Sequence, residues 1–161
     1  QIASGKAITP HFLKSIDGKP VEFAPTELFT PKEKAQLPLV RRGMYEVGNN
    51  PDGGTAYKLI HTAVVPLAVK TGTAQVVGIS QTTKKRMKEA DMDYFHRSHA
   101  WMTSFGPYDK PQYAVTVLVE HGGGGGSAAG PVIMQIYEKL VQMGYIDANA
   151  TTIKDSAKKT K

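Results

Sequence analysis

The stretch L-A-V-K-T-G-T-A-Q-V-V-G-I, residues 67–79, places a small-residue centre between two short apolar runs. This pattern predicts a β-strand. A strand at the edge of a sheet carries unpaired backbone N–H and C=O groups, so an extended peptide can pair with it as an additional strand. We therefore expect residues 70–75, K-T-G-T-A-Q, to form one wall of a site that binds a peptide ending in a carboxylate.

Each residue of the K-T-G-T motif has a chemical property that suits such a site. Lys70 supplies a positive charge, and Thr71 supplies a hydroxyl that can donate to a carboxylate oxygen. Gly72 has no Cβ, so a ligand backbone can approach closely. The backbone N–H of Thr73 can stabilise an oxyanion during acyl transfer. Because K, T and G are common residues, an ordinary buried strand with a bulge at Gly72 is the alternative interpretation.

The residues around this motif form an ordered series, which is found on both sides of it. Downstream lie H-A-W, F-G-P, Y-A-V-T-V-L-V-E and H-G-G-G-G-G-S-A-A-G-P, at residues 99–101, 105–107, 113–120 and 121–131. Upstream lie G-K-A-I-T-P-H and G-G-T-A, at residues 5–11 and 53–56. Over roughly residues 1–143, the series resembles the C-terminal part of the transpeptidase domain of class B penicillin-binding proteins, above all their elongation-type members. The resemblance implies an α+β fold, the C-terminal part of the penicillin-binding and serine β-lactamase-like fold, with helices packed on an antiparallel sheet.

Two further motifs belong to the active site of that family: S-x-x-K, which holds the nucleophilic serine, and S-x-N or S-x-D. The pattern S-x-x-K occurs at residues 156–159, in a lysine-rich tail after the K-T-G motif, whereas the family order is the reverse. The pattern S-x-D occurs at residues 15–17, where Asp17 and Gly18 predict a turn between two short strands. We interpret both matches as chance, so this chain is expected to lack the nucleophile.

The beginning of the chain supports the same expectation. It starts at Gln1, without an initiator Met, a signal peptide or an apolar membrane-spanning run. We interpret the chain as a fragment, produced either by proteolysis or by dividing a longer protein.

For the function, the resemblance implies a peptidoglycan D,D-transpeptidase, inhibited by β-lactams, whose serine lies on another segment and attacks the D-Ala-D-Ala bond of a stem peptide. Lys70 and Thr71 would recognise the substrate carboxylate, Gly72 would permit close approach, and the Thr73 N–H would help to form the oxyanion hole. The alternatives are a non-catalytic binding or scaffold domain that keeps the fold and, ranked last, a β-lactamase. The fragment alone is expected to be inactive.

The resemblance also implies partners and a location. The expected partners are the stem peptide, β-lactams and a companion chain carrying the S-x-x-K and S-x-N or S-x-D segments. By family, a lipid-linked glycan polymerase and a rod-shape scaffold protein are also expected. The expected location is the periplasmic face of the bacterial inner membrane, with the anchor outside this chain, and no cofactor is expected.

Composition limits the other classes of function. The net charge of +6 comes largely from clusters at residues 84–88 and 154–161, which indicate solvated loop and tail charges. No aromatic residues are interleaved with these charges, so we exclude nucleic-acid binding. The chain has no Cys, and His96 and His99 would point to opposite faces of a strand, so we expect no metal. The glycines at 122–126 lack the G-K-[ST] ending of a phosphate-binding loop and are expected to connect a strand to the last helix.

The predicted organisation is one transpeptidase portion over residues 1–149 and a disordered basic tail over residues 150–161. The first part should contain short strands within residues 7–24 and a loop with one helical turn over residues 26–35. An apolar spacing of three and four predicts a helix over residues 37–47. Further strands are expected at 67–79, 98–106 and 111–120, followed by a helix at 128–143. The sheet-facing stripe of this helix is expected to be Ile133, Ile136, Leu140 and Met143, with Gly144 ending it.

Overall fold

The computed structural model describes residues 1–78 and 87–147. The chain divides into two compact units, residues 1–43 and residues 44–161. Two sequence predictions, the disordered tail at 150–161 and the chance S-x-x-K match at 156–159, lie outside the described residues. In the part of the chain that is described, no helix is both long enough and apolar enough to cross a membrane.

The first unit contains two small antiparallel pairs of strands. Strand β1 (Lys6–Ala7) pairs with β4 (Thr26–Glu27), and β2 (Ser15–Ile16) pairs with β3 (Lys19–Pro20). Between β2 and β3, Asp17 and Gly18 adopt φ values of 48° and 75°. Such positive angles are typical of the two central residues of a tight hairpin, so the predicted turn is confirmed.

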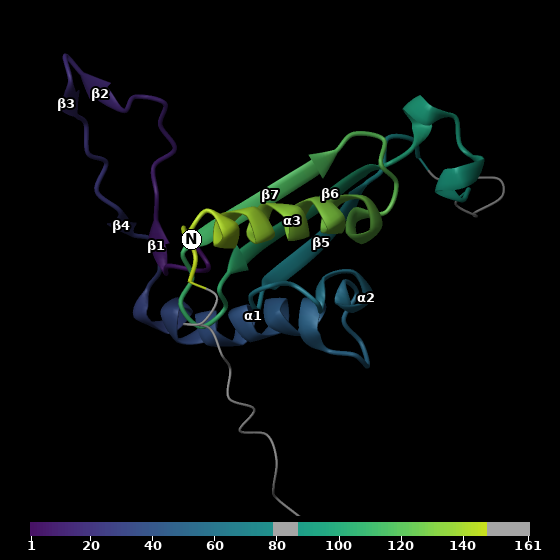
Figure 1. Cartoon of the computed structure of the whole chain (residues 1–161), viewed down its shortest axis with the longest axis horizontal. Coiled ribbons are helices and arrows are strands. Elements are labelled where there is room, and N and C mark those ends of the chain that lie inside the picture. Colours follow the sequence, from purple (N-terminus) through teal and green to yellow (C-terminus); the bar gives the residue numbers. More distant parts are fainter. Residues whose placement is uncertain (79–86, 148–161) are drawn as a thin grey trace, which may run out of the picture. The chain divides into compact units, whose positions relative to one another are not determined.

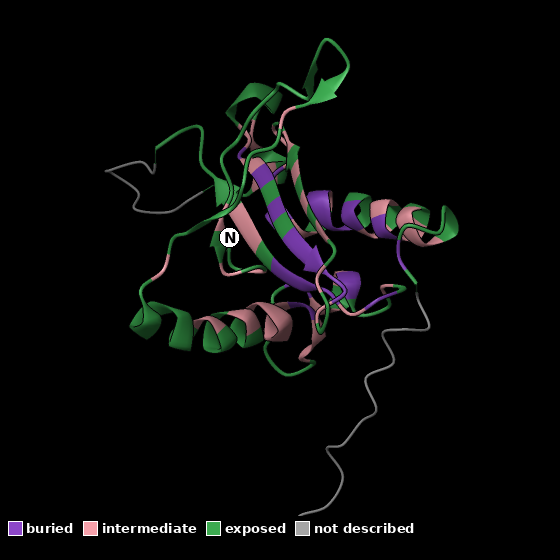
Figure 2. Ribbon diagram, turned by 90° about the vertical axis from the view of Figure 1, so that its left-hand side faces the viewer, coloured by how far each residue is buried: buried purple, intermediate pink, exposed green. Residues whose placement is uncertain are grey.

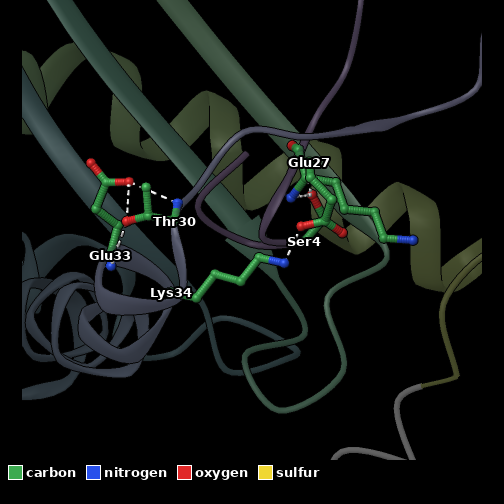
Figure 3. A network of polar contacts seen from close by, with 6 residues as sticks. Ser4, Glu27, Thr30, Glu33 and Lys34 are labelled. Carbon is green, nitrogen blue, oxygen red and sulfur yellow. Dashed lines mark hydrogen bonds and ion pairs between the residues drawn. The ribbon is translucent and has the colours of Figure 1, made fainter.

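Helix α1 (Pro31–Asn49) starts six residues earlier than the predicted helix at 37–47. Its start is a capping box, shown in Figure 3: the Glu33 carboxylate accepts hydrogen bonds from the Thr30 N–H and hydroxyl, both at 2.8 Å. The Glu33 N–H donates to the Thr30 hydroxyl at 3.3 Å, and Pro31 occupies the first helical position, where a missing N–H costs nothing. The predicted loop over 26–35 is therefore wrong in part: these residues hold β4 and, where one helical turn was expected, the first turn of α1.

An ion pair connects two segments of the first unit. The Lys34 ammonium donates to the Glu27 carboxylate (Figure 3), and this contact lowers the pKa of Glu27. The pair joins β4 to the start of α1. Because both side chains are exposed, it contributes little to the free energy of unfolding.

The second unit is built on an antiparallel sheet in the order β5-β6-β7. Strand β5 (Ala68–Ala74) is shorter than the predicted 67–79, whereas β6 (His99–Gly106) and β7 (Tyr113–Val119) lie within the predicted ranges. All seven residues of β5 pair one to one with β6, and Gly72 faces Trp101. The register has no extra residue, so the alternative of a bulge at Gly72 is wrong.

The two faces of this sheet differ in burial, as the alternation along β6 in Figure 2 shows. Ala100, Met102 and Ser104 are buried beneath helix α3 (Gly125–Gln142), which crosses that face in Figure 1. On the opposite face, Trp101 is 40% exposed. The period of two along a strand explains this division, because successive side chains point to opposite faces.

Helix α3 begins three residues before the predicted helix at 128–143, inside the glycine run. Its buried stripe is Ala129, Ile133 and Tyr137. Of the predicted stripe, Ile133 is in the core and Leu140 packs against it, but Met143 is 60% exposed, so the prediction is wrong for Met143. The helix ends close to the predicted position, and Gly144 has a φ of 75°.

Tyr137 is fully buried, and its hydroxyl donates to the Tyr113 carbonyl oxygen at 3.2 Å. Burial raises the pKa of this phenol. The buried phenol explains why an apolar pattern alone misplaced the stripe: Tyr137 lies in the core only because its polar end has a partner.

The remaining helical segments are short. Helix α2 (Tyr57–Ile60) lies between α1 and β5, and the 3-10 turns η1 (Glu89–Asp91) and η2 (Tyr94–His96) lie before β6. Ile60 packs in the core with Val69.

Candidate functional site

The K-T-G motif lies on β5, at one edge of the sheet. In the described part of the chain, β5 has β6 as its only strand partner. The start of β5 is fixed from the end of α1, because the Asn49 side-chain amide donates to the Leu67 carbonyl oxygen at 2.8 Å. The core residue Val69 then anchors the strand, and the exposed residues of the motif follow directly after it.

Lys70 is exposed, and its ammonium nitrogen donates to the Thr71 carbonyl oxygen at 2.6 Å. In the pairing register it faces Thr103, on the sheet face opposite α3. Its long side chain nevertheless keeps the ammonium beside the strand backbone. The positive charge is thus held at the β5 backbone, next to the Thr71 carbonyl oxygen.

Three threonine hydroxyls lie at β5, on the sheet face opposite to that of Lys70. Thr71 and Thr73 are two residues apart on β5, so their side chains share the face that carries α3. The hydroxyl oxygens of Thr71 and Thr55 are 3.4 Å apart. Hydroxyl groups can donate to anionic oxygens, so these threonines are donors suited to a carboxylate.

The first turn of α3 completes this arrangement. The Gly125 N–H donates to the Thr73 hydroxyl oxygen at 3.3 Å. A Cβ on Gly125 would overlap the Gly72 carbonyl oxygen and lie 2.7 Å from the Trp101 carbonyl oxygen. The helix can therefore approach β5 only because this position is glycine. Its N-terminal end, which carries partial positive charge, lies beside the motif.

The structure brings Lys70, Thr71, Gly72 and Thr73 together as predicted, but their roles in binding and catalysis stay predictions. Two additional contributors were missed. Thr55 lies in the G-G-T-A segment, whose sequence pattern alone indicates no role for this threonine. Gly125 lies in the glycine run, where the number of consecutive glycines was the available signal for close backbone packing.

The glycine run connects β7 to α3, as predicted. The S-x-D match at Ser15 belongs to the exposed β2 strand and its turn, which agrees with its rejection as a catalytic motif.

The position of His96 differs from the prediction, whereas that of His99 agrees with it. His99 is on β6, but His96 lies in η2 before the strand, so the argument from opposite strand faces does not apply to it. His99 instead accepts a hydrogen bond at Nδ1 from the His121 N–H, at 3.0 Å. Among residues 1–78 and 87–147, no group of three or more His, Cys, Asp or Glu side chains is placed to hold a metal ion.

Comparison with protein families gives one match that spans most of the chain: residues 1–138 match the penicillin-binding protein transpeptidase domain. The chain is also 35% identical, over 142 residues, to the peptidoglycan D,D-transpeptidase MrdA of Haemophilus influenzae. That alignment covers 85% of this chain and 21% of the relative.

Solved structures give the same result. The penicillin-binding protein 2 of Helicobacter pylori, in its complex with MreC, matches with a TM-score of 0.73 and 45% identity, covering 90% of this chain and 23% of that chain. Penicillin-binding protein 2 of Pseudomonas aeruginosa, in complex with WCK 5153, matches with a TM-score of 0.65 and 33% identity, covering 86% and 27%. The chain therefore spans only about a fifth to a quarter of the length of these relatives.

Proposed function

Because this chain belongs to the penicillin-binding protein transpeptidase domain family, we propose that it supplies the K-T-G wall of a peptidoglycan D,D-transpeptidase. The family and the α+β fold predicted from the sequence are confirmed. The activity belongs to a complete domain in which a serine from outside this chain faces β5.

One observation carries the proposal: the hydroxyls of Thr71 and Thr73 lie on one face of an edge strand, and Thr73 is held by the Gly125 N–H. An edge strand can receive a stem peptide as an additional strand. The terminal carboxylate of that peptide would accept hydrogen bonds from the threonine hydroxyls. Lys70 would contribute a positive charge beside them, and charge-assisted hydrogen bonds of this kind are stronger than neutral ones.

The chemistry is an acyl transfer in two steps. The serine oxygen attacks the carbonyl carbon between the two D-alanines, and the Thr73 N–H donates to the negative oxygen that develops. The C–N bond then breaks, the terminal D-alanine leaves with a proton, and an ester to the serine remains. In the second step, an amine of a neighbouring stem peptide attacks the ester, an amide forms and the serine recovers its proton. A β-lactam acylates the same serine and occupies the same wall.

The partners follow from the family. The Helicobacter pylori relative is described in a complex with MreC. We extend this to a rod-shape scaffold protein and a lipid-linked glycan polymerase as partners of the complete protein that contains this chain. The proposed location is the periplasmic face of the bacterial inner membrane, where peptidoglycan is cross-linked.

A fluorescent penicillin tests the proposal directly. The part of Helicobacter pylori penicillin-binding protein 2 that precedes the matched region is joined to Gln1 to give a completed protein. This protein, and the 161-residue chain alone, are incubated with the label, denatured and separated. We expect covalent label on the completed protein and none on the chain alone. Label on the chain alone would contradict the placement of the nucleophile, and a folded but unlabelled completed protein would favour a non-catalytic scaffold domain.

The role of Lys70 is tested in the completed protein. Lys70→Ala should lower the acylation rate roughly 10- to 100-fold, because a hydrogen bond to a charged group contributes about 1.5–3 kcal/mol. Lys110→Ala is the matched control, since Lys110 is an exposed lysine in the turn between β6 and β7. Equal acylation rates for the two variants would show that Lys70 has no role in the site.

A further inference from the structure

A second cluster of polar contacts, at the beginning of the glycine run, consists of Glu89, Ser98 and Gly123. Glu89, in η1, is half-buried, and its carboxylate accepts two hydrogen bonds from Ser98. The Ser98 N–H donates to one oxygen at 2.8 Å, and the Ser98 hydroxyl donates to the other at 2.9 Å. Ser98 is 2% exposed and directly precedes β6, so this carboxylate fixes the backbone that leads into the strand.

The same serine holds the glycine run. The Gly123 N–H donates to the Ser98 carbonyl oxygen at 2.8 Å. Gly123 has a φ of 77°, and a Cβ at this position would lie 3.3 Å from the Glu89 Cβ. The backbone angle favours glycine, and the close contact leaves little room for a Cβ. Glu89 therefore binds Ser98, and Ser98 in turn binds Gly123. We call these three residues the Glu89 clamp.

A histidine pair supports the clamp from the neighbouring residues. His121 has a φ of 53°, which is strained for a residue with a side chain. Its N–H donates to His99 Nδ1, and its own Nδ1 lies 3.2 Å from the Arg97 carbonyl oxygen, to which it can donate. Residues 97–99 thus form hydrogen bonds with two residues of the loop, His121 and Gly123.

The loop held in this way leads directly into α3. Gly124 precedes the helix, no side chain caps it, and the next residue, Gly125, donates its N–H to Thr73. Because one lone pair of the Thr73 hydroxyl accepts this N–H, the hydroxyl hydrogen must point elsewhere. A shift of the loop would move both the Gly125 N–H and the β5 backbone against which Gly125 packs.

We propose that Glu89 is a positioning residue: through Ser98 and Gly123 it holds the glycine run in place, so that Gly125 fixes Thr73 of the K-T-G strand. This inference rests on the proposed function for its catalytic consequence, but the clamp itself is a property of the chain. Glu89 does not touch the reacting atoms. Its effect is on the acylation step, which requires the Thr73 N–H in place, and far less on the initial non-covalent binding of a β-lactam.

The test compares Glu89→Ala, Glu89→Gln and the control Asp91→Asn. Asp91 lies in the same 3-10 turn and is exposed. Glutamine keeps one acceptor oxygen for Ser98, so Glu89→Gln should be intermediate. Amide hydrogen exchange of residues 121–126 is measured in the 161-residue chain and in the completed protein. The acylation rate constant and the initial dissociation constant for fluorescent penicillin are measured in the completed protein.

We expect Glu89→Ala to speed exchange of residues 121–126 by about tenfold or more, with the middle of β7 unchanged. The acylation rate constant should fall by at least about tenfold, because small displacements of catalytic groups have large effects on rate. Asp91→Asn should change neither quantity. A completed protein that is never labelled would refute the proposed function, while the exchange data would still decide the clamp.

Three results would overturn the inference. Unchanged exchange at 121–126 would show that Glu89 does not hold the loop. Faster exchange with an unchanged acylation rate would show that the loop does not position the site. Exchange that rises equally in β7 and at the end of α3 would assign Glu89 a general stabilising role instead.

Discussion

The two long helices of this chain begin in opposite ways. Helix α1 has its own cap, in which Thr30 and Glu33 satisfy backbone and side-chain donors of the first turn. Helix α3 begins at glycines, has no side-chain cap, and gives the N–H of Gly125 to Thr73 on β5. The start of α1 is hydrogen-bonded by residues next to it in the sequence. At the start of α3, the Gly125 N–H has the Thr73 hydroxyl as its partner only when the K-T-G strand lies against the helix.

This difference shows what the glycines at the start of α3 provide. Glycine is a poor residue inside a helix and is less effective than Ser, Thr, Asp or Asn as a cap. At Gly125, however, any side chain would collide with the β5 and β6 backbones. Glycine at this position weakens the start of the helix, but it allows the end of the helix to contact the strand closely.

The largest effect should come from Gly125→Ala. The added Cβ would overlap the Gly72 carbonyl oxygen, and we expect the free energy of unfolding to fall by about 3 kcal/mol. Urea titration followed by circular dichroism measures this. The control is Gly43→Ala, since Gly43 lies inside α1 with no atom within 4 Å of an added Cβ. That change should stabilise the chain by about 0.5–1 kcal/mol, and a loss of similar size for both variants would refute the distinction between the helices.

A smaller effect is expected at the cap of α1. Thr30→Ala removes the hydroxyl that accepts the Glu33 N–H and should destabilise the first turn by about 1 kcal/mol. Amide hydrogen exchange in residues 31–35 measures it locally. In α3, Ser127 donates to the Gly124 carbonyl oxygen and caps no N–H, so Ser127→Ala should change exchange there by less than about 0.5 kcal/mol. A larger effect of Ser127→Ala than of Thr30→Ala would show that α3 has a side-chain cap after all.

The smallest effect is a dependence on pH that α1 should show and α3 should not. Hydrogen bonds from the Thr30 N–H and hydroxyl lower the pKa of Glu33. A lowered pKa stabilises the folded chain fully above the ordinary glutamate value of about 4.3. This stabilisation is lost as the pH falls through the lowered value. Exchange in the first turn of α1 should therefore speed up between about pH 5 and 3, relative to residues 126–130 of α3. In Glu33→Gln the acceleration should disappear, and its persistence would assign it to Glu27, whose pKa is also lowered.

Sequence patterns predicted the sheet better than the helix starts. Alternation and the K-T-G centre located β5, β6 and β7 to within a few residues, since each strand has a clear apolar run bounded by polar or turn residues. The start of α1 was misplaced although Thr30, Pro31 and Glu33 form a recognisable capping box, because residues 32–36 are mostly polar and the apolar spacing begins only at Leu37. The start of α3 could not be found from helix propensity, since its first residues are glycines and the reason for them is contact with β5.

The candidate site was predicted in part. Lys70, Thr71, Gly72 and Thr73 are consecutive, so one motif was enough to place them together. Thr55 and Gly125 reach the same place from distant parts of the sequence, through the loop before α2 and the start of α3. Contacts of this kind depend on how the chain packs, and neither periodicity nor spacing along the sequence reports them.

The half-exposed Trp101 gives the chain an optical reporter. It is the only tryptophan in the sequence, and it faces Gly72 across the sheet, with its Cβ 3.3 Å from where a Cβ on that glycine would lie. Indole emission shifts to shorter wavelength when water is removed from the ring. Emission from the unmodified chain should therefore follow, in real time and without any added dye, whatever comes to cover this face of the K-T-G strand.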